Sequence, residues 1–187
     1  MNPRAPHNEN EDELRKAAEA LRTGSAEAFH LLYTRYQQSV YRFCLRMIGE
    51  QAAAKDAFQE TFMKVYEHRM DFRGENFAAW LFTISRRVCL NALRQEKKFD
   101  TFEEEIHVRE SSSQSDIGMK DCIQRALASL PVTLREALIL REYEGYSYQE
   151  IAEIIGIEIS LAKIRVHRAR IIMRRLLAPI VQERHEP

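Results

Sequence analysis

Apolar residues recur at every third or fourth position through most of this chain of 187 residues, and this spacing limits the fold more than any other feature. Such spacing gathers apolar side chains on one face of an α-helix, whereas a half-buried strand needs alternation at every second position. The longest example is a set of eight residues: Phe29, Leu32, Tyr33, Tyr36, Val40, Phe43, Cys44 and Met47. Alternating β-branched runs are absent. The sequence therefore predicts an all-α fold.

Breaks in the helical pattern divide the first half of the chain into short helices. We expect a tail over 1–12 and then helices over 14–21, 25–49, 52–68 and 77–97, with a loop over 71–76. Ser25 suits the N-cap of the second of these helices, and Gly49 suits its end. Together, residues 13–98 are expected to form one small helical domain.

A second helical domain is expected over residues 119–178, followed by a tail over 179–187. Helical periodicity resumes over 121–130. Thr133 with Glu136 and Ser147 with Glu150 have the spacing of capping boxes, in which a hydroxyl and a carboxylate satisfy the first turn of a helix. Ser160 is the expected N-cap of a long basic helix that ends before Pro179.

The charge of the chain is partitioned, although its formal total is zero. Between residues 163 and 175 there are six basic residues and no acid, whereas residues 100–116 hold six acids against Arg109 alone. The acidic stretch is also rich in serine and poor in apolar residues, so residues 99–118 are predicted to be a flexible linker. The basic stretch suits a nucleic-acid partner, which the total charge alone would not suggest.

Several function classes lack their usual sequence signals. Cys44, Cys89 and Cys122 are too far apart in sequence for a metal or disulfide motif, and we expect all three to be buried in a reducing compartment. No phosphate-binding glycine loop or catalytic motif is recognisable. No apolar run is long enough to cross a membrane. The sequence thus predicts a cytoplasmic protein that is no enzyme, with no cofactor and no metal.

Residues 147–175 have the layout of a helix-turn-helix motif. A short helix with Ile151, Ala152 and Ile155 on its inner face would end at Gly156, and a basic helix would follow. On that basic helix Ala162, Val166, Ala169 and Met173 would face inward. The opposite face would present Lys163, Ile164, His167, Arg168 and Ile171 to the major groove of DNA. Arginine and lysine could contact phosphates or guanine, and Ile164 a thymine methyl group.

The expected helix over 77–97 carries a polar stripe made of Thr83, Arg87, Asn91 and Arg94. Aromatic residues lie before and within it, and basic residues interleaved with aromatics suit single-stranded nucleic acid. For Trp80 a place in the core is the simpler interpretation. For Phe72, which lies in the loop, the pattern does not decide between the core and a base-stacking surface. The expected helix over 52–68 differs, because Asp56, Gln59, Glu60 and Lys64 give it a mixed-charge face that fits either solvent or a protein partner.

Taken in order, these motifs resemble an extracytoplasmic-function (ECF) sigma factor, a promoter-specificity subunit of bacterial RNA polymerase. The resemblance covers residues 14–97 and 120–177. It rests on Ala28-Phe29 with Leu32-Tyr33, Asp56 with Gln59-Glu60 and Phe62, Phe72-Arg73-Gly74 with Trp80-Leu81, Leu130-Pro131 with Arg135-Glu136, and Tyr148 with Glu150-Ile151-Ala152 through Arg165 to Arg170.

The resemblance implies a role for each matching surface. Asp56, Gln59, Glu60 and Lys64 would bind the β′ clamp helices of core polymerase, and the second domain would meet its β flap. Phe72, Arg73 and Asn76 would capture a base flipped from the non-template strand of the −10 element, and Thr83, Arg87, Asn91 and Arg94 would line the −10 surface. Ser160, Lys163, Ile164, Arg165, His167 and Arg168 would read the −35 duplex. The resemblance also suggests an anti-sigma factor as a partner, although no residue by itself predicts one.

The chain departs from the common family pattern at three places. The loop over 73–77 is one residue shorter. Arg87 stands where asparagine is common, and Asn91 where aspartate is. Residues 160–164 replace the usual Gly-Thr-Val-Lys-Ser. These departures affect which promoter is read rather than the function class.

A flexible linker cannot fix the spacing of two DNA sites, so a rigid partner must hold the domains apart. In the free monomer the domains are expected to fold together and hide both DNA surfaces, which predicts weak promoter binding without polymerase. The acidic linker could mimic RNA in a basic channel or serve as a passive spacer. Replacing Glu103, Glu104 and Glu105 with glutamine separates these two, since unchanged initiation and promoter escape would reject mimicry.

Two other interpretations stay open at this stage. A conventional helix-turn-helix regulator would use residues 14–97 to bind a ligand or dimerise, and it predicts dimers and a palindromic site. A helical adaptor would have no DNA role, and its basic helix would be a solvated face. A monomer that co-purifies with core polymerase would decide against the first, and loss of promoter-specific transcription on substitution of Arg165 and Arg168 would decide against the second.

Overall fold

The computed structural model describes residues 9–73, 76–100 and 118–183, and the side chains of residues 12–73, 76–95 and 118–179. Within these ranges the chain forms eight α-helices and one short 3₁₀ helix, with no strand, which confirms the all-α prediction. The expected linker and the two ends of the chain lie largely outside the described residues.

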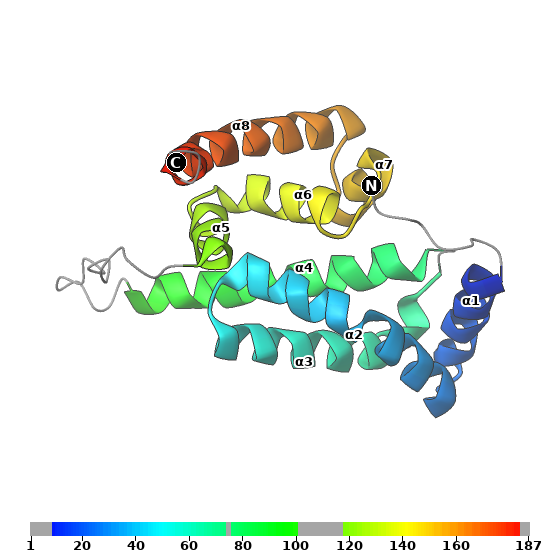
Figure 1. Ribbon diagram of the computed structural model, residues 1–187. Coiled ribbons are helices and arrows are strands. Elements are labelled where there is room, and N and C mark those ends of the chain that lie inside the picture. The colour runs from blue at the N-terminus through cyan, green and yellow to red at the C-terminus, as the bar shows by residue number, and fades with distance from the viewer. Residues whose placement is uncertain (1–8, 74–75, 101–117, 184–187) are drawn as a thin grey trace.

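Four helices and the 3₁₀ helix make up the N-terminal module, residues 9–100 (Figure 1). They are α1 (Glu9–Arg22), α2 (Ala26–Ile48), α3 (Gln51–Glu67), η1 (Arg69–Asp71) and α4 (Phe77–Asp100). As predicted, Ser25 caps α2 by accepting a hydrogen bond from the Ala28 N–H, and Gly49 ends α2 with a φ of 93°. Helix α1 begins at Glu9, inside the expected tail, rather than near Leu14.

The C-terminal module, residues 118–183, holds α5 (Met119–Ala128), α6 (Val132–Glu142), α7 (Tyr148–Ile155) and α8 (Ile159–Glu183). The expected capping box of Thr133 and Glu136 is wrong. Helix α6 begins at Val132 after Pro131 with no side-chain cap, and Glu136 is fully buried instead of reaching back to the first turn.

Helix α8 also differs from the sequence prediction at both ends. It begins at Ile159, where the Ala162 N–H donates to the carbonyl of Glu158, so Ser160 lies in the first turn and is not the N-cap. It continues through Pro179 to Glu183, whereas the sequence predicts a stop before Pro179. Proline leaves only the carbonyl of Arg175 without its helical donor, and because Arg175 is exposed, water can take that place.

The two modules pack against each other, as the sequence analysis expects for the free monomer, and they share one core. Helix α4 contacts α7, and α2 contacts both α5 and α6. In Figure 1 the C-terminal module lies along α2 and α4, while α3 is on the far side of the N-terminal module. One continuous apolar core runs through both modules, with Phe82 of α4 against Tyr146 of the α6–α7 loop at 5.3 Å between ring centroids.

Hydrogen bonds across this intermodule interface satisfy the end of α2. The last carbonyls of a helix have no partner within the helix. Here the Gln124 side-chain amide donates to the carbonyls of Leu45 and Arg46, at 3.2 and 3.3 Å, and Arg135 donates to the carbonyl of Met47. The C-terminal module therefore caps a helix of the N-terminal module, and separating the modules exposes these carbonyls.

Candidate nucleic-acid interfaces

Helices α7 and α8 form the predicted helix-turn-helix. Ser147 accepts a hydrogen bond from the Glu150 N–H at 3.2 Å, and the Glu150 carboxylate accepts one from the Ser147 N–H at 2.7 Å, which confirms this capping box. Gly156 ends α7 with a φ of 76°, in the left-handed region where a side chain is disfavoured. Both ends of α7 are thus fixed locally, and they set the angle at which α8 leaves the turn.

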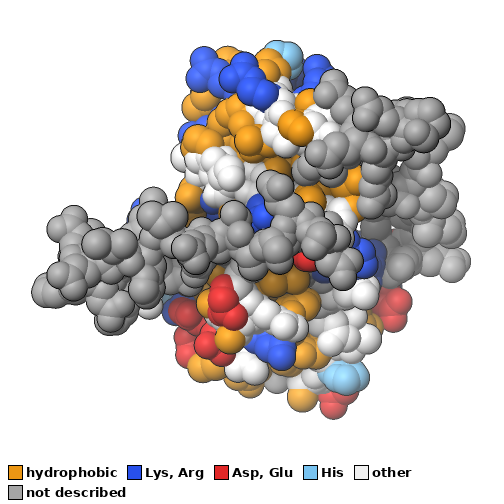
Figure 2. Space-filling view, turned by 60° about the vertical axis from the view of Figure 1, so that its left-hand side comes forward, with side chains coloured by type: hydrophobic (Ala, Val, Ile, Leu, Met, Phe, Trp, Pro, Cys, Tyr) orange, Lys and Arg blue, Asp and Glu red, His pale blue; other side chains and the backbone are white. Residues whose placement is uncertain are grey.

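The two faces of α8 divide as the sequence predicted. Ala162, Val166 and Ala169 are fully buried, and Met173 is half-buried. Lys163, Ile164, His167, Arg168 and Ile171 are all exposed. In Figure 2 lysine, arginine and histidine side chains gather at the upper end of the molecule, where α8 lies in Figure 1. This face is open even though the modules are packed together, so the expectation that both DNA surfaces are hidden is wrong for α8.

Arg165, which the sequence places in the same reading helix, lies differently. Its side chain is 19% exposed and its Nη1 pairs with Oε1 of Glu136 at 3.3 Å. The same carboxylate accepts two hydrogen bonds from Arg86 of α4, Nε to Oε2 at 2.8 Å and Nη2 to Oε1 at 3.2 Å. Glu136 therefore joins the basic helix of one module to α4 of the other.

The polar stripe on α4 is partly covered in this form. Arg87, Asn91 and Arg94 are exposed. Thr83 is half-buried, because its hydroxyl donates to the carbonyl of Ala79 at 2.9 Å and reaches the carbonyl of Ile154 in α7 at 3.5 Å. The intermodule interface thus covers the beginning of the stripe and leaves its second half in solvent.

Aromatic side chains before α4 form a packed cluster rather than an open stacking surface. Phe72 is 4% exposed and lies 5.6 Å from Phe77 and 5.4 Å from Trp80, measured between ring centroids. Arg73 is exposed. Asn76 has a local function that the sequence did not indicate, since its side chain accepts a hydrogen bond from the Ala79 N–H at the start of α4. In this form Phe72 would have to leave the cluster to stack on a base.

The face of α3 that the sequence singled out is open. Asp56, Gln59 and Glu60 are exposed, and Lys64 pairs with Glu60 at 3.4 Å. Beside this face lies an apolar groove of about 400 Å³ between α2 and α3. Its lining is mainly aromatic: Phe29, Tyr33, Phe58, Gln59, Phe62, Met63, Tyr66 and Glu67. Met63 and Tyr66 of this lining are exposed, and exposed aromatic and methionine side chains are typical of protein-binding surfaces.

Two family models match the chain, Sigma-70 region 2 over residues 32–99 and Sigma-70, region 4 over residues 120–173. The sigma factor CarQ of Myxococcus xanthus is 32% identical over 170 residues, which cover 88% of this chain and 98% of CarQ. The ECF sigma-E factor of Haemophilus influenzae is 30% identical over 179 residues, which cover 87% of this chain and 94% of that protein. The chain belongs to the ECF sigma factors.

A solved structure agrees with this membership. The sigma factor RpoE from Bartonella quintana, crystallised with the anti-sigma factor NepR, matches with a TM-score of 0.71 and 27% identity, covering 82% of this chain and 98% of RpoE. The present sigma factor is therefore a promoter-specific transcription initiation factor for RNA polymerase. This result confirms the family resemblance and favours it over the ligand-sensing regulator and the adaptor.

The remaining sequence predictions for this sigma factor have mixed outcomes. Cys44 and Cys89 are buried as expected, whereas Cys122 is only half-buried because α5 lies at the edge of the C-terminal module. Among the described residues, no group of three or more histidine, cysteine or acidic side chains could hold a metal ion. None of the described helices is both long and apolar enough to span a membrane.

Sequence reasoning missed the residues that join the two modules of the sigma factor. Gln124, Arg135 and Glu136 lie in helices whose periodicity was recognised, but periodicity identifies the apolar face of a helix and not the partner of a polar side chain. The sequence signal for Glu136 was its spacing from Thr133, which suggested a cap. The adjacent charges of Arg135 and Glu136, directly before four apolar residues, Ala137 to Leu140, are the better sequence signal, and the structure buries all six.

Proposed function

We propose that this sigma factor directs core RNA polymerase to promoters by reading the −35 duplex with α8 and by capturing melted −10 DNA on α4 and the preceding loop. The observation that carries the proposal is the outer face of α8. Lys163, Ile164, His167 and Arg168 are all exposed, carry no acid among them, and stand on a helix whose entry angle a capped α7 fixes. A helix presented in this way fits the major groove.

The test is run-off transcription with core polymerase, this chain and genomic DNA, followed by mapping of start sites. Lys163→Ala combined with Arg168→Ala should abolish start-site selection, whereas Lys120→Ala on the exposed side of α5 should not. Arg165 is better left intact, because it pairs with the buried Glu136 of α6 and its loss would also change the packing of the C-terminal module. For each duplex phosphate that a variant no longer neutralises, the log–log salt slope of binding should fall by about 0.9. Unchanged start sites in the double variant would overturn the assignment of α8.

For the −10 element we assign Arg87, Asn91 and Arg94 to the exposed half of the surface and Thr83 to its covered half. Phe72, Arg73 and Asn76 complete it, and Phe72 reaches a base by leaving its contacts with Phe77 and Trp80. Positive side chains along α4 suit the phosphate backbone of DNA. Aromatic rings suit unstacked bases, because stacking on a ring stabilises each base by about 1–3 kcal/mol. Arg94→Ala should reduce promoter opening, measured by permanganate reactivity of unpaired thymines, without changing −35 binding.

We assign core polymerase to the α3 face of Asp56, Gln59, Glu60 and Lys64, through the β′ clamp helices, and the β flap to the C-terminal module. The adjoining aromatic groove supports this choice, because it supplies apolar area next to a polar rim. Asp56→Arg should prevent co-purification with core polymerase. Glu13→Arg, which makes the same charge change on exposed α1, should not.

The packed arrangement of modules supports a further part of the proposal, namely that polymerase must separate them. The match to RpoE covers 82% of the chain, more than either module alone, and RpoE was captured with an anti-sigma factor. We therefore assign the packed form to the free or sequestered protein, with an anti-sigma factor as a partner of the latter. Because the start of the α4 stripe is covered in the packed form and the α8 face alone is fully open, a gel shift with the isolated chain should show weak promoter binding. Tight specific binding at physiological salt would contradict this assignment.

A further inference from the structure

Glu136 is a carboxylate with almost no access to solvent that is shared by two arginines from different modules. Its side chain is 1% exposed, and those of Arg86 and Arg165 are each 19% exposed. Arg165 belongs to α8 of the same module, whereas Arg86 belongs to α4 across the interface. The cross-module pair has the better geometry, because Arg86 makes two hydrogen bonds at 2.8 and 3.2 Å and Arg165 makes one at 3.3 Å.

Separating the modules has unequal consequences for the two arginines. Glu136 keeps Arg165, so the C-terminal module still holds a paired carboxylate. Arg86 loses its partner, since Glu136 is the only carboxylate that pairs with it among the described residues. A guanidinium released at a solvent-facing position is strongly charged and can bind a phosphate through two parallel hydrogen bonds.

Arg86 lies on α4 beside the polar stripe, where its released guanidinium could contact DNA. Arg86 follows Thr83 by three residues and precedes Arg87, so it borders the polar stripe at its covered end. In the packed form Thr83 reaches Ile154 and Arg86 pairs with Glu136, so one interface covers both side chains. Arg87, Asn91 and Arg94 stay exposed. Opening the modules therefore uncovers Thr83 and adds the charge of Arg86 beside the stripe, in the half of α4 nearer Phe77.

We propose that Arg86 is a phosphate-contacting residue for single-stranded −10 DNA that Glu136 holds in the packed form, so that DNA and the C-terminal module compete for one guanidinium. The inference rests on the proposed function of α4. Because the two partners exclude each other, binding of single-stranded DNA favours separated modules, and separation favours binding, by the same factor. The −10 surface is complete only when the −35 module has moved away from it.

The test compares Glu136→Gln, Arg86→Gln and the double variant, with Glu153→Gln at an exposed position of α7 as the control. Small-angle scattering gives the radius of gyration, and titration with a mixed-sequence single-stranded 12-mer at several salt concentrations gives affinity and salt slope. Both single variants should be more extended than the wild type. Glu136→Gln should bind the oligonucleotide more tightly than the wild type, because it opens the modules and retains Arg86.

Arg86→Gln should bind more weakly than Glu136→Gln, with a salt slope smaller by about 0.7, the value for one phosphate on a single strand. The double variant should match Arg86→Gln. Equal affinities and slopes for the two single variants would overturn the proposal, because Arg86 would then only hold the modules together. Unchanged scattering in both would overturn it as well, since Glu136 would then not control separation.

Two controls keep these outcomes distinct from other failures. Arg86→Gln leaves the Glu136–Arg165 pair in place, so its C-terminal module should fold even if Glu136→Gln is unstable, and circular dichroism checks both. Run-off transcription by the wild type tests the proposed function separately. If the wild type transcribes while Arg86→Gln binds the oligonucleotide like Glu136→Gln, only the role of Arg86 is overturned.

Discussion

Arg135 joins the end of α2 to the turn between α5 and α6 through a buried side chain. It is 7% exposed and donates to the carbonyls of Met47, Ala128 and Leu130. Burial lowers the pKa of its guanidinium, since solvent no longer stabilises the charge, but arginine stays charged in proteins. Three backbone carbonyls, two of them in buried hydrogen bonds, therefore receive a donor from one residue.

Arg135→Met should reduce the free energy of unfolding by about 2–4 kcal/mol, because methionine fills the space but leaves these carbonyls without a donor. Urea denaturation followed by circular dichroism measures the loss. Arg125→Met, at an exposed position on α5, should change stability by less than about 0.5 kcal/mol. Equal losses in the two variants would mean that the hydrogen bonds to these carbonyls contribute little.

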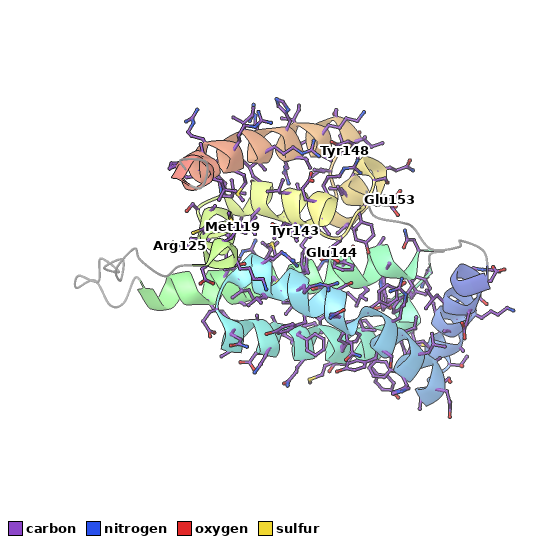
Figure 3. All side chains as sticks on the ribbon, viewed as in Figure 1. Met119, Arg125, Tyr143, Glu144, Tyr148 and Glu153 are labelled. Atoms are coloured by element: carbon purple, nitrogen blue, oxygen red, sulfur yellow. The ribbon has the colours of Figure 1, made fainter. Side chains whose placement is uncertain are left out.

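Glu144 faces α2 at the intermodule interface, next to Tyr143 (Figure 3). Burial raises the pKa of its carboxyl above the ordinary value of 4.5, although Arg42 and Arg46 oppose the shift. Its Oε1 has no hydrogen-bond partner among the described residues. The folded protein therefore retains this proton at pH values where the unfolded chain has lost it.

The sign of the effect follows from that difference in bound protons. Stability falls as the pH rises where the folded state binds more protons than the unfolded state. The free energy of unfolding of the wild type, relative to Glu144→Gln, should fall as the pH rises above about 4.5 and then level off. Urea titrations of both proteins across pH 4–8 measure this, with Glu153→Gln as an exposed control. A constant or rising difference would contradict the prediction.

At the scale of single helices, the two serines that the sequence offered as caps are not equivalent. Ser147 caps α7 in a complete capping box, whereas Ser160 lies inside the first turn of α8. Ser147→Ala should cost about 1 kcal/mol of unfolding free energy, because an N–H at the start of α7 loses its acceptor. Ser160→Ala should change it by less than about 0.5 kcal/mol. Thermal denaturation of the two variants measures these losses. A larger loss for Ser160→Ala than for Ser147→Ala would mean that Ser160 is the N-cap of α8, as the sequence predicts.

Local signals in the sequence were sufficient for most of the helices and for the exposed basic face of α8. Ser25, Gly49, Ser147 and Gly156 act within one helical turn, so their effects can be read from neighbouring residues. Glu136 could not be assigned in this way, because its partners Arg86 and Arg165 lie 50 and 29 residues away. The packing of the modules likewise depends on contacts between distant segments, which helical periodicity does not encode.

At the scale of the whole molecule, hydrogen bonds and an ion pair hold the two modules together, and separating the modules breaks them. Separation breaks the hydrogen bonds that Gln124 and Arg135 donate to carbonyls at the end of α2. It also breaks the ion pair between Arg86 and Glu136. Water replaces some of these interactions, so the net cost is smaller than their sum. A partner that holds the modules apart must offset the rest, which suits a large assembly such as polymerase better than a short stretch of DNA.

The covalent connection through residues 101–117 should itself favour the packed form. Short connections give intramolecular contacts an effective concentration of the order of 1 mM. If a protease site is inserted between residues 101 and 117 and cleaved, contact between the two fragments should become dependent on concentration. Size-exclusion chromatography with light scattering should show one species near 1 mM and two species at micromolar dilution, whereas the uncleaved protein stays compact throughout.

Glu136→Gln should shift the cleaved protein toward separation at every concentration, because the fragments lose the ion pair that joins α4 to α6. Fragments that elute apart at the highest concentration, while each keeps its helical spectrum, would contradict the role given to this interface in the free protein.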